Sequence, residues 1–349
     1  MLRNLKLMAL VYKPGVSFLN DYPAFSWLTG FFLPHIVETT KSPLVNASRI
    51  AGYFLTFTGL LSFAICAIQV YYSKLFKKGV VTGGLYTLVR HPQYTAFAIS
   101  GLGMLFVWPR YLVLIMFITL LFVYYLLAKA EESECEAKFG ESYIKYKNQT
   151  NMFFPFKINI PITEKLPVTA RFAIVSVFYI VLVLGSLQLA KLTKAAAVNS
   201  LYTYTDEKAT YISVFEKEDE ELQQLIAIAN SDLAVKQFIE SKNNQNTKLI
   251  SYIMPGDMYI SEIPMQQPEI ITSHVSNPNY DESVYKIVYT KANLPETTET
   301  NTASHLINNT LSLKPFFEVR IDMKNKKITD IIELNISVVN YANMPEPVF

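Results

Sequence analysis

The sequence predicts an all-α polytopic membrane bundle of four or five transmembrane helices, followed by a soluble α+β domain. The 349 residues are 51% hydrophobic and 13% aromatic, with a mean hydropathy of +0.21, which is high for a soluble chain. The long apolar runs lie almost entirely before residue 190, whereas the remainder is rich in Asn, Thr, Glu and Lys. The two parts of the chain are therefore expected to face different solvents.

Four segments follow from this division. Residues 1–49 form an N-terminal segment with a possible membrane helix, residues 50–160 a membrane core, residues 161–194 the last transmembrane helix with its flanks, and residues 195–349 the soluble domain. No signal-peptide pattern opens the chain, so we expect the N-terminus to be retained.

The predicted spans follow from the lengths of the apolar runs. A helix needs about 20 apolar residues to cross the hydrocarbon, and residues 50–72 and 172–190 provide them. Residues 94–108 and 111–128 are shorter runs with only two residues between them, so they predict a helical hairpin. Residues 16–37 either span the membrane or lie at its interface, because one aspartate and two prolines interrupt the run.

Basic residues near the span ends predict the orientation. Lysines and arginines gather before and after the hairpin, whereas Arg110 is the only basic residue at its tip. The positive-inside rule therefore places the open end of the hairpin in the cytoplasm. The last span then runs outward and places the C-terminal domain on the opposite side, although Lys191 and Lys194 argue mildly against this.

Nucleic-acid binding and a disulfide-stabilised fold receive no support. A formal net charge of +2 and the absence of a basic patch with interleaved aromatics do not favour nucleic-acid binding. Cys66 lies in a predicted span and Cys135 in the cytoplasmic segment, so no disulfide framework is expected.

The residues that carry chemistry stand next to the apolar runs of the hairpin. Arg90 and His91 come directly before a proline, which suits the first turn of a helix, and Tyr94 follows within that turn. The second run of the hairpin leads into Glu131 and Glu132, so two carboxylates return to the level of Arg90 and His91. Ionisable groups at membrane depth are costly and tend to be functional.

Each of these features also has a structural interpretation. Gly101 and Gly103 allow the close approach of a ligand or of another helix, and small residues are common at helix contacts in membranes. Glutamates after a span can form a solvated helix face. Arginine and histidine can anchor a helix end at the lipid headgroups. The residues indicate a functional site only in combination.

In combination, six pieces occur in a familiar order: Gly84-Leu85-Tyr86, Arg90-His91-Pro92-x-Tyr94, Gly101-x-Gly103, Glu131-Glu132, Phe139-Gly140-x-x-Tyr143-x-x-Tyr146 and Phe153-Phe154-Pro155. With this order and spacing, residues 50–156 resemble the isoprenylcysteine carboxyl methyltransferase and phospholipid methyltransferase superfamily. The family pattern does not account for the domain after residue 195.

The resemblance implies an integral membrane methyltransferase that holds S-adenosyl-L-methionine in the cytoplasmic mouth of the bundle. Arg90 and Glu131 are the predicted catalytic residues, and no metal is required. An arginine suits the carboxylate of the cofactor, and carboxylates suit its cationic and hydroxyl groups. The cofactor-binding residues that the resemblance implies are Arg90, His91, Tyr94, Gly101, Gly103, Glu131 and Glu132.

The acceptor is expected to be lipid-like or prenylated and to enter from the bilayer. An isoprenylcysteine carboxylate, a phospholipid amine and a thiol all suit a membrane-facing pocket. Two alternatives to the methyltransferase stay open. One is a membrane reductase for sterol-like lipids, although no Gly-rich nicotinamide-binding turn is visible; the other is a noncatalytic anchor for a sensor domain.

The C-terminal domain is predicted to bind a partner, because it contains no catalytic constellation. Helices are expected over residues 206–229 and from an N-cap at Ser231-Asp232 to residue 239. Strands are expected at residues 248–254, 258–263, 283–289, 316–323 and 327–334, with the first two and the last two forming hairpins. A protein is a possible partner for this domain.

Overall fold

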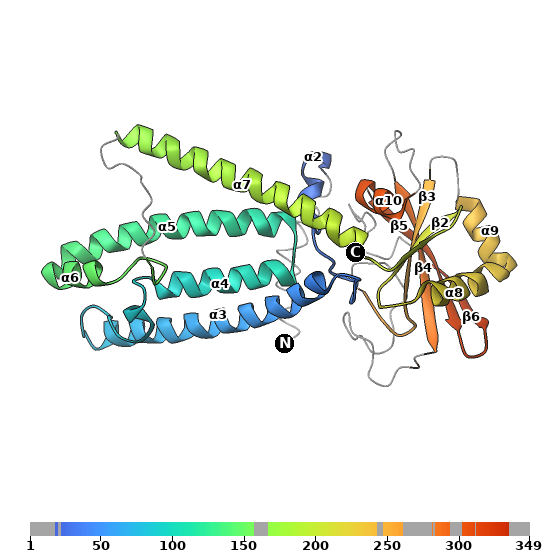
Figure 1. Cartoon of the computed structure of the whole chain (residues 1–349), viewed down its shortest axis with the longest axis horizontal. Coiled ribbons are helices and arrows are strands. Elements are labelled where there is room, and N and C mark those ends of the chain that lie inside the picture. Colours follow the sequence, from blue (N-terminus) through green and yellow to red (C-terminus); the bar gives the residue numbers. More distant parts are fainter. Residues whose placement is uncertain are drawn as a thin grey trace. The chain divides into compact units, whose positions relative to one another are not determined.

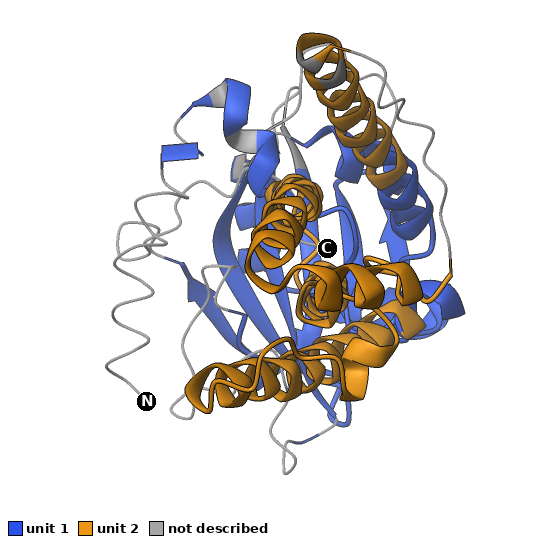
Figure 2. Ribbon diagram, turned by 90° about the vertical axis from the view of Figure 1, so that its left-hand side faces the viewer, with its two compact units in different colours: residues 1–46, 191–349 blue, residues 47–190 orange. Residues whose placement is uncertain are grey.

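A computed structural model gives the architecture of two compact units (Figure 1). It describes residues 18–19, 22–156, 167–242, 247–260, 281, 283–293, 302–310 and 312–334. Residues 47–190 form one unit, here called the membrane unit, and residues 1–46 together with 191–349 form the other, here called the sheet unit (Figure 2).

The membrane unit is helical. Its helices are α3 (Pro43–Leu75), α4 (Pro92–Val107), α5 (Tyr111–Phe139), α6 (Glu141–Gln149) and α7 (Val168–Asn199), with the short 3-10 helix η2 (Gly84–Thr87) before α4. Helices α3 and α7 continue for a few residues into the sheet unit.

Three helices in the described part of the chain are long and apolar enough to cross a membrane: α3, α5 and residues 172–199 of α7. Helix α4 has 16 residues, so it is about 24 Å long and falls short of a hydrocarbon core of about 30 Å. Three spans are therefore supported, and the predicted number of four or five is not confirmed.

The predicted helical hairpin is confirmed in α4 and α5. Helix α4 starts at Pro92, whose missing backbone N–H costs nothing in the first turn, where N–H groups have no partner within the helix. It ends at Val107, before Pro109. Helix α5 continues beyond its apolar run to Phe139, and Gly140 ends it with a φ of +56°, a conformation that favours glycine. This extension carries the two predicted glutamates out of the apolar run on a continuous helix.

Glycines set the contact between α3 and α4. A Cβ on Gly59 would come within 2.5 Å of the Ser100 nitrogen, and one on Gly103 within 2.4 Å of the Thr56 nitrogen. The two backbones thus touch where side chains are absent, as is usual for helix pairs in membranes. Helix α7 is tied to α5 by a hydrogen bond of 2.7 Å between Thr119 Oγ1 and the Tyr179 hydroxyl.

The N-terminal segment does not form a span in its described part. Its described residues include the helical residues 18–19, α2 (Pro23–Ser26) and η1 (Trp27–Thr29), and residues 31–33, 36 and 37 are buried. The Glu38 nitrogen donates to the Val214 carbonyl at 2.7 Å, so this segment packs within the sheet unit. Most of residues 16–21 lie outside the described residues.

In its described residues, the sheet unit contains a six-stranded sheet in the order β1-β2-β3-β4-β5-β6. They are β1 (Thr203–Thr205), β2 (Ala209–Ser213), β3 (Thr247–Pro255), β4 (Val284–Asn293), β5 (Ser312–Asp322) and β6 (Lys327–Glu333). Neighbours are antiparallel except β2 and β3, which are parallel and connected through α8 (Asp219–Ser231) and α9 (Leu233–Lys242). Helix α10 (Ala303–Asn309) precedes β5.

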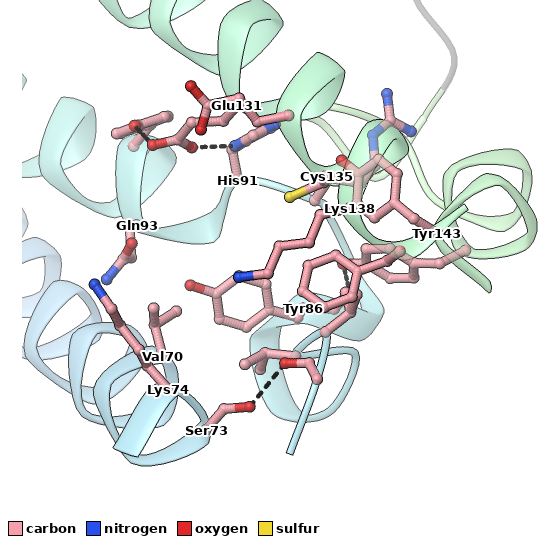
Figure 3. Close-up of a pocket in the computed structure, with 18 of the residues that line it drawn as sticks. Val70, Ser73, Lys74, Tyr86, His91, Gln93, Glu131, Cys135, Lys138 and Tyr143 are labelled. Atoms are coloured by element: carbon pink, nitrogen blue, oxygen red, sulfur yellow. Dashed lines mark hydrogen bonds and ion pairs between the residues drawn. The ribbon is translucent and has the colours of Figure 1, made fainter. Parts of the chain in front are cut away.

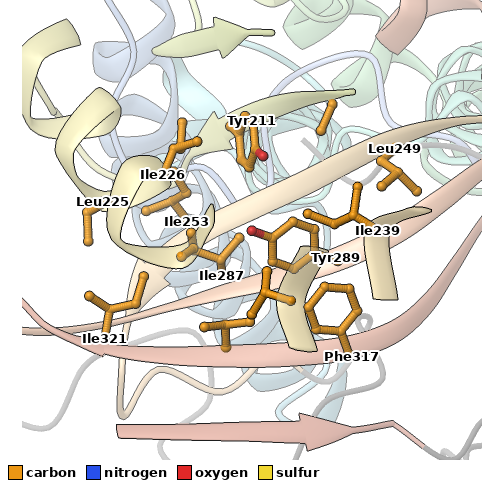
Figure 4. Packing of buried hydrophobic residues seen from close by; sticks show 14 of the residues in the cluster. Tyr211, Leu225, Ile226, Ile239, Leu249, Ile253, Ile287, Tyr289, Phe317 and Ile321 are labelled. Atoms are coloured by element: carbon orange, nitrogen blue, oxygen red, sulfur yellow. The ribbon is translucent and has the colours of Figure 1, made fainter. Parts of the chain in front are cut away.

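The core of this unit lies between the sheet and α8 and α9 (Figure 4). Leu222, Leu225 and Ile226 recur at helical spacing along α8 and are buried. Tyr289 and Phe317 on neighbouring strands stack with ring centroids 4.2 Å apart. The α+β part of the chain thus has a hydrophobic core of its own.

Several predicted elements of this unit are confirmed, namely β3, β4, the β5–β6 hairpin and the second helix. Asp232 is the N-cap of α9, because its Oδ1 accepts from the Ala234 nitrogen at 2.7 Å.

Two predictions were wrong. A helix was predicted over residues 206–229, but residues 209–213 form the buried strand β2, because the run Thr210-Tyr211-Ile212 pairs with β3. The helix α8 begins only at Asp219, where its first turn is acidic. Residues 258–260 are not paired with β3, which instead pairs with β4, and residues 261–263 lie outside the described residues.

Candidate active site

The cavity of the membrane unit lies where α3, α4, α5 and α6 meet (Figure 3). It has a volume of about 650 Å³, within the range of about 300–1,000 Å³ that is usual for small-molecule and cofactor sites. Of the predicted site residues, Arg90, His91, Tyr94 and Glu131 line it. The other lining residues are Val70, Ser73, Lys74, Lys77, Gly79, Val80, Val81, Tyr86, Gln93, Glu134, Cys135, Lys138, Phe139, Tyr143 and Tyr146.

Arg90 and Glu132 form a buried ion pair. Arg90 Nε lies 2.6 Å from Glu132 Oε1, and the side chains are 10% and 2% exposed. Arg90 Nη1 also donates to the carbonyls of Lys147 and Thr150, the former at 3.0 Å. The charge of Arg90 is thus balanced by Glu132, and its guanidinium group holds the C-terminal end of α6.

Lys147 of α6 completes this charged network. Its Nζ lies 3.3 Å from Glu132 Oε2 and also forms an ion pair with Glu136. The hydrogen bond with Glu136, followed by the charge of Glu132, raises the pKa of Lys147 above its usual value in spite of partial burial. The network therefore joins α5 to α6 through two carboxylates of α5.

Glu131 lines the cavity together with Glu134, and it is the carboxylate that His91 and Tyr94 hold in place. It is 46% exposed, and its Oε1 accepts a hydrogen bond of 2.5 Å from the Tyr94 hydroxyl. Its Oε2 lies 3.5 Å from His91 Nδ1. Glu131 is therefore held in place by two neighbours while part of it stays accessible to a ligand.

His91 lies between the two glutamates, because its Nε2 is 3.5 Å from Glu132 Oε1. Burial disfavours the charged imidazolium, but hydrogen bonds and the charges of Glu131 and Glu132 outweigh it and raise the pKa of His91. The ring of His91 is stacked on that of Tyr94, and Tyr94 on that of Tyr124, with centroid separations of 5.5 and 4.7 Å.

Residues 150–153 are hydrogen-bonded alongside residues 89–91. The Arg90 and His91 nitrogens donate to the carbonyls of Asn151 and Met152 at 2.8 and 3.1 Å. The Tyr146 hydroxyl donates to the Tyr86 carbonyl at 2.7 Å. Tyr143 and Tyr146 line the cavity, so α6 forms one of its walls, and residues 150–153 hold that helix against the start of α4.

The two predicted glycines are not brought to the cavity. A Cβ on Gly101 would meet the Phe117 ring of α5 at 3.1 Å, and Gly103 packs against α3. Helix packing, the structural interpretation of these glycines, accounts for their positions. Glu132 likewise lies behind the cavity wall and supports it through Arg90.

Sequence reasoning did not assign Tyr86, Tyr143 or Tyr146 to the cavity, nor Lys74, Lys77 and Lys138. The three tyrosines belong to the motif pieces, and the i,i+3 spacing of Tyr143 and Tyr146 places them on one face of α6. The three lysines contributed only to the predicted orientation, because a cluster after a span gives no sign of which side chains turn inward.

The lining residues fit S-adenosyl-L-methionine in chemistry and size. An accessible carboxylate suits an ammonium group or ribose hydroxyls, lysines suit a carboxylate, and tyrosine rings suit a base or a sulfonium cation. Among the described residues, no group of three or more metal-ligating side chains lies together.

Comparison with known proteins agrees with the motifs. Residues 47–142 match the family model described as phospholipid methyltransferase. A segment of 69 residues, 18% of the chain, is 41% identical to the probable O-methyltransferase ustE of Ustilaginoidea virens and covers 23% of that protein. No solved structure matches the chain.

The matched region contains α4, α5 and nearly all of α3, together with the predicted site residues on them. The finding and the apolar helices support an integral membrane methyltransferase in general terms. Residues 47–142 are thus similar to the phospholipid methyltransferase family, in agreement with the superfamily that the sequence motifs resemble.

Proposed function

We propose that the chain is a membrane methyltransferase that binds S-adenosyl-L-methionine in the cavity and methylates a lipid-like acceptor. The observation that carries this proposal is the accessible carboxylate of Glu131, held by Tyr94 and His91 in a cavity formed mainly by the segment that matches the methyltransferase family. A carboxylate fixed in this way suits the cationic and hydroxyl groups of the cofactor.

When bound, the cofactor supplies a methyl group on a sulfonium centre. The task of the protein is then alignment and exclusion of water, since the transfer neutralises the sulfonium and creates no additional charge. Tyr86, Tyr143 and Tyr146 contribute aromatic walls that exclude water. Arg90 and Glu132 hold one wall in position.

The acceptor decides whether a base is needed. A carboxylate or thiolate acceptor can react as it is, whereas an ammonium group must first lose a proton. In our proposal, the accessible carboxylate of Glu131 is the base that removes this proton, and His91, next to it, accepts the proton or balances the charge of the carboxylate. In this proposal the acceptor enters from the bilayer, and the apolar helices of the membrane unit support that route.

The sidedness proposal depends on charge alone. Lys74, Lys77 and Lys138 line the cavity, and basic residues at span ends favour the cytoplasmic side. We propose a cytoplasmic cofactor site and a sheet unit that acts as an interaction module, with a protein as the possible partner.

Calorimetric titration of the detergent-purified protein with S-adenosyl-L-methionine and S-adenosylhomocysteine tests the proposal. We expect saturable binding that Glu131→Gln weakens, while Glu141→Gln, an exposed carboxylate of α6 outside the cavity, leaves it unchanged. If folded wild-type protein bound neither compound, the methyltransferase proposal would be wrong, and nicotinamide cofactors would be the next ligands to titrate.

A further inference from the structure

The positive charges around the cavity fall into two groups. Arg90 and Lys147 are paired with glutamates, at 2.6 Å and 3.3 Å from Glu132. In contrast, Lys74, Lys77 and Lys138 line the cavity but take part in none of the ion pairs found among the described residues. The cations that remain for a ligand are therefore lysines.

The engaged state of Arg90 limits what it can contribute to a ligand. Its Nε and Nη1 already donate to Glu132, Lys147 and Thr150. A ligand carboxylate that recruited this guanidinium group would compete with a buried glutamate that is 2% exposed. Leaving that glutamate without its partner would be strongly unfavourable.

The lysines come from two parts of the chain around the cavity, and one of these parts, α5, also carries Glu131. Lys74 and Lys77 come from the end of α3 and the turn after it, and Lys138 from the last turn of α5. Figure 3 shows Lys138 extending into the space near Tyr86, and Lys74 close to Gln93. Flexible lysine stems with a point charge can meet a carboxylate without a fixed fork geometry.

We infer that Lys74, Lys77 and Lys138 bind the carboxylate of the S-adenosyl ligand, the role that an arginine would otherwise fill. The inference rests on the proposed function. Glu131 then takes the ammonium or hydroxyl groups of the same ligand, and Arg90 is a positioning residue that holds residues 147–150 in place. The amino-acid end of the ligand is thus recognised by opposite charges from α3 and α5.

The expected effect is moderate for one lysine and larger for the set. All three side chains are exposed, so removal of a single charge should weaken binding by about two- to fivefold. Replacement of all three with methionine, which preserves the apolar stems, should weaken binding of the homocysteine ligand on the order of tenfold or more.

A pair of ligands separates this role from a general effect on the cavity. S-adenosylhomocysteine carries the carboxylate, whereas 5′-methylthioadenosine has the same adenosine and thioether without the amino-acid end. Both are titrated calorimetrically into the full-length wild type, the triple variant Lys74→Met/Lys77→Met/Lys138→Met, and the control Lys145→Met, an exposed lysine of α6 outside the cavity. We expect the triple variant to lose affinity for the first ligand only, and the loss to shrink at high salt.

Three results would overturn the inference. The triple variant could bind S-adenosylhomocysteine as well as wild type does, it could lose affinity for both ligands equally, or it could keep both affinities while the KM for the acceptor rises. The last result would assign the lysines to the acceptor. Wild-type protein that binds neither ligand would contradict the proposed function itself, and is thereby distinguished from the other outcomes.

Discussion

The ion pair between Arg90 and Glu132 allows the sharpest stability prediction. In Glu132→Gln, the guanidinium group of Arg90, 10% exposed, loses the carboxylate that lies 2.6 Å from its Nε. Removal of one partner of a buried pair costs about 3–5 kcal/mol. Arg90 keeps its bonds to the carbonyls of Lys147 and Thr150, so we expect the lower end, about 3 kcal/mol.

Thermal unfolding of the detergent-purified variants measures this loss. For a unit of roughly 150 residues, about 3 kcal/mol corresponds to a decrease in Tm on the order of 10 °C. The exposed Glu134 of the same helix provides the control, because Glu134→Gln removes a similar charge where solvent screens it.

The apolar double variant Arg90→Met/Glu132→Leu strengthens the test. It removes both charges, so the penalty of an unpaired buried charge disappears and at least half of the lost stability should return. A Tm for Glu132→Gln within about 2 °C of wild type, or a double variant less stable than either single variant, would refute the reasoning.

Three further predictions concern the cavity and the helix contacts. Glu131→Gln should weaken S-adenosylhomocysteine binding about tenfold while lowering Tm by less than Glu132→Gln does, because Glu131 is 46% exposed; calorimetry with a parallel melt checks this, and a large loss of stability would contradict it. Burial lowers the pKa of His91, but Glu131 and Glu132 raise it by more, so the folded pKa is above the unfolded value of about 6.5. The charged imidazolium therefore stabilises the fold fully below the unfolded pKa, and this stabilisation is lost as pH rises through the folded pKa. The Tm difference between wild type and His91→Gln should shrink with increasing pH, and a difference that grows with pH would contradict the reasoning. Gly103→Ala should reduce the yield and Tm of folded protein, because its Cβ would lie 2.4 Å from the Thr56 nitrogen, whereas Gly101→Ala, facing a ring at 3.1 Å, should be tolerated better; equal behaviour of the two variants would argue against the close α3–α4 contact.

The sequence predicted those features that depend on local pattern. Length and hydropathy indicated the spans that became α3, α5 and α7, and Pro109-Arg110 indicated the α4–α5 hairpin. Glycine is a typical residue at a helix end, and Gly140 ends α5 with a positive φ. Such signals lie within a few residues of the structure that they specify.

Features that depend on distant partners were missed. The Thr210-Tyr211-Ile212 run has apolar residues at spacings that also suit a helix, and only its pairing with β3, about 40 residues later, selects the strand. Residues 31–37 were ambiguous for the same reason: their apolar side chains are buried in the sheet unit, which sequence pattern alone does not distinguish from burial in lipid.

The site shows the same limit. The motifs placed Arg90, His91, Tyr94 and Glu131 together, and all four line the cavity. Adjacent residues on a helix point in directions about 100° apart, so Glu131 faces the cavity while Glu132 faces Arg90 and Lys147 behind it. Sequence treated the two glutamates alike because it does not give the rotation of α5 about its axis.

Methyl transfer itself tests the central claim most directly. Membranes that contain the protein would be incubated with S-adenosyl-L-methionine labelled in the methyl group, together with a total lipid extract, and the organic phase counted for label. We expect label to enter the organic phase with wild-type protein and to fall to background with Glu131→Gln at equal folded amounts. Wild-type protein that binds the cofactor but transfers no label to any lipid would contradict a lipid-like acceptor, and label that persists undiminished with Glu131→Gln would contradict the site.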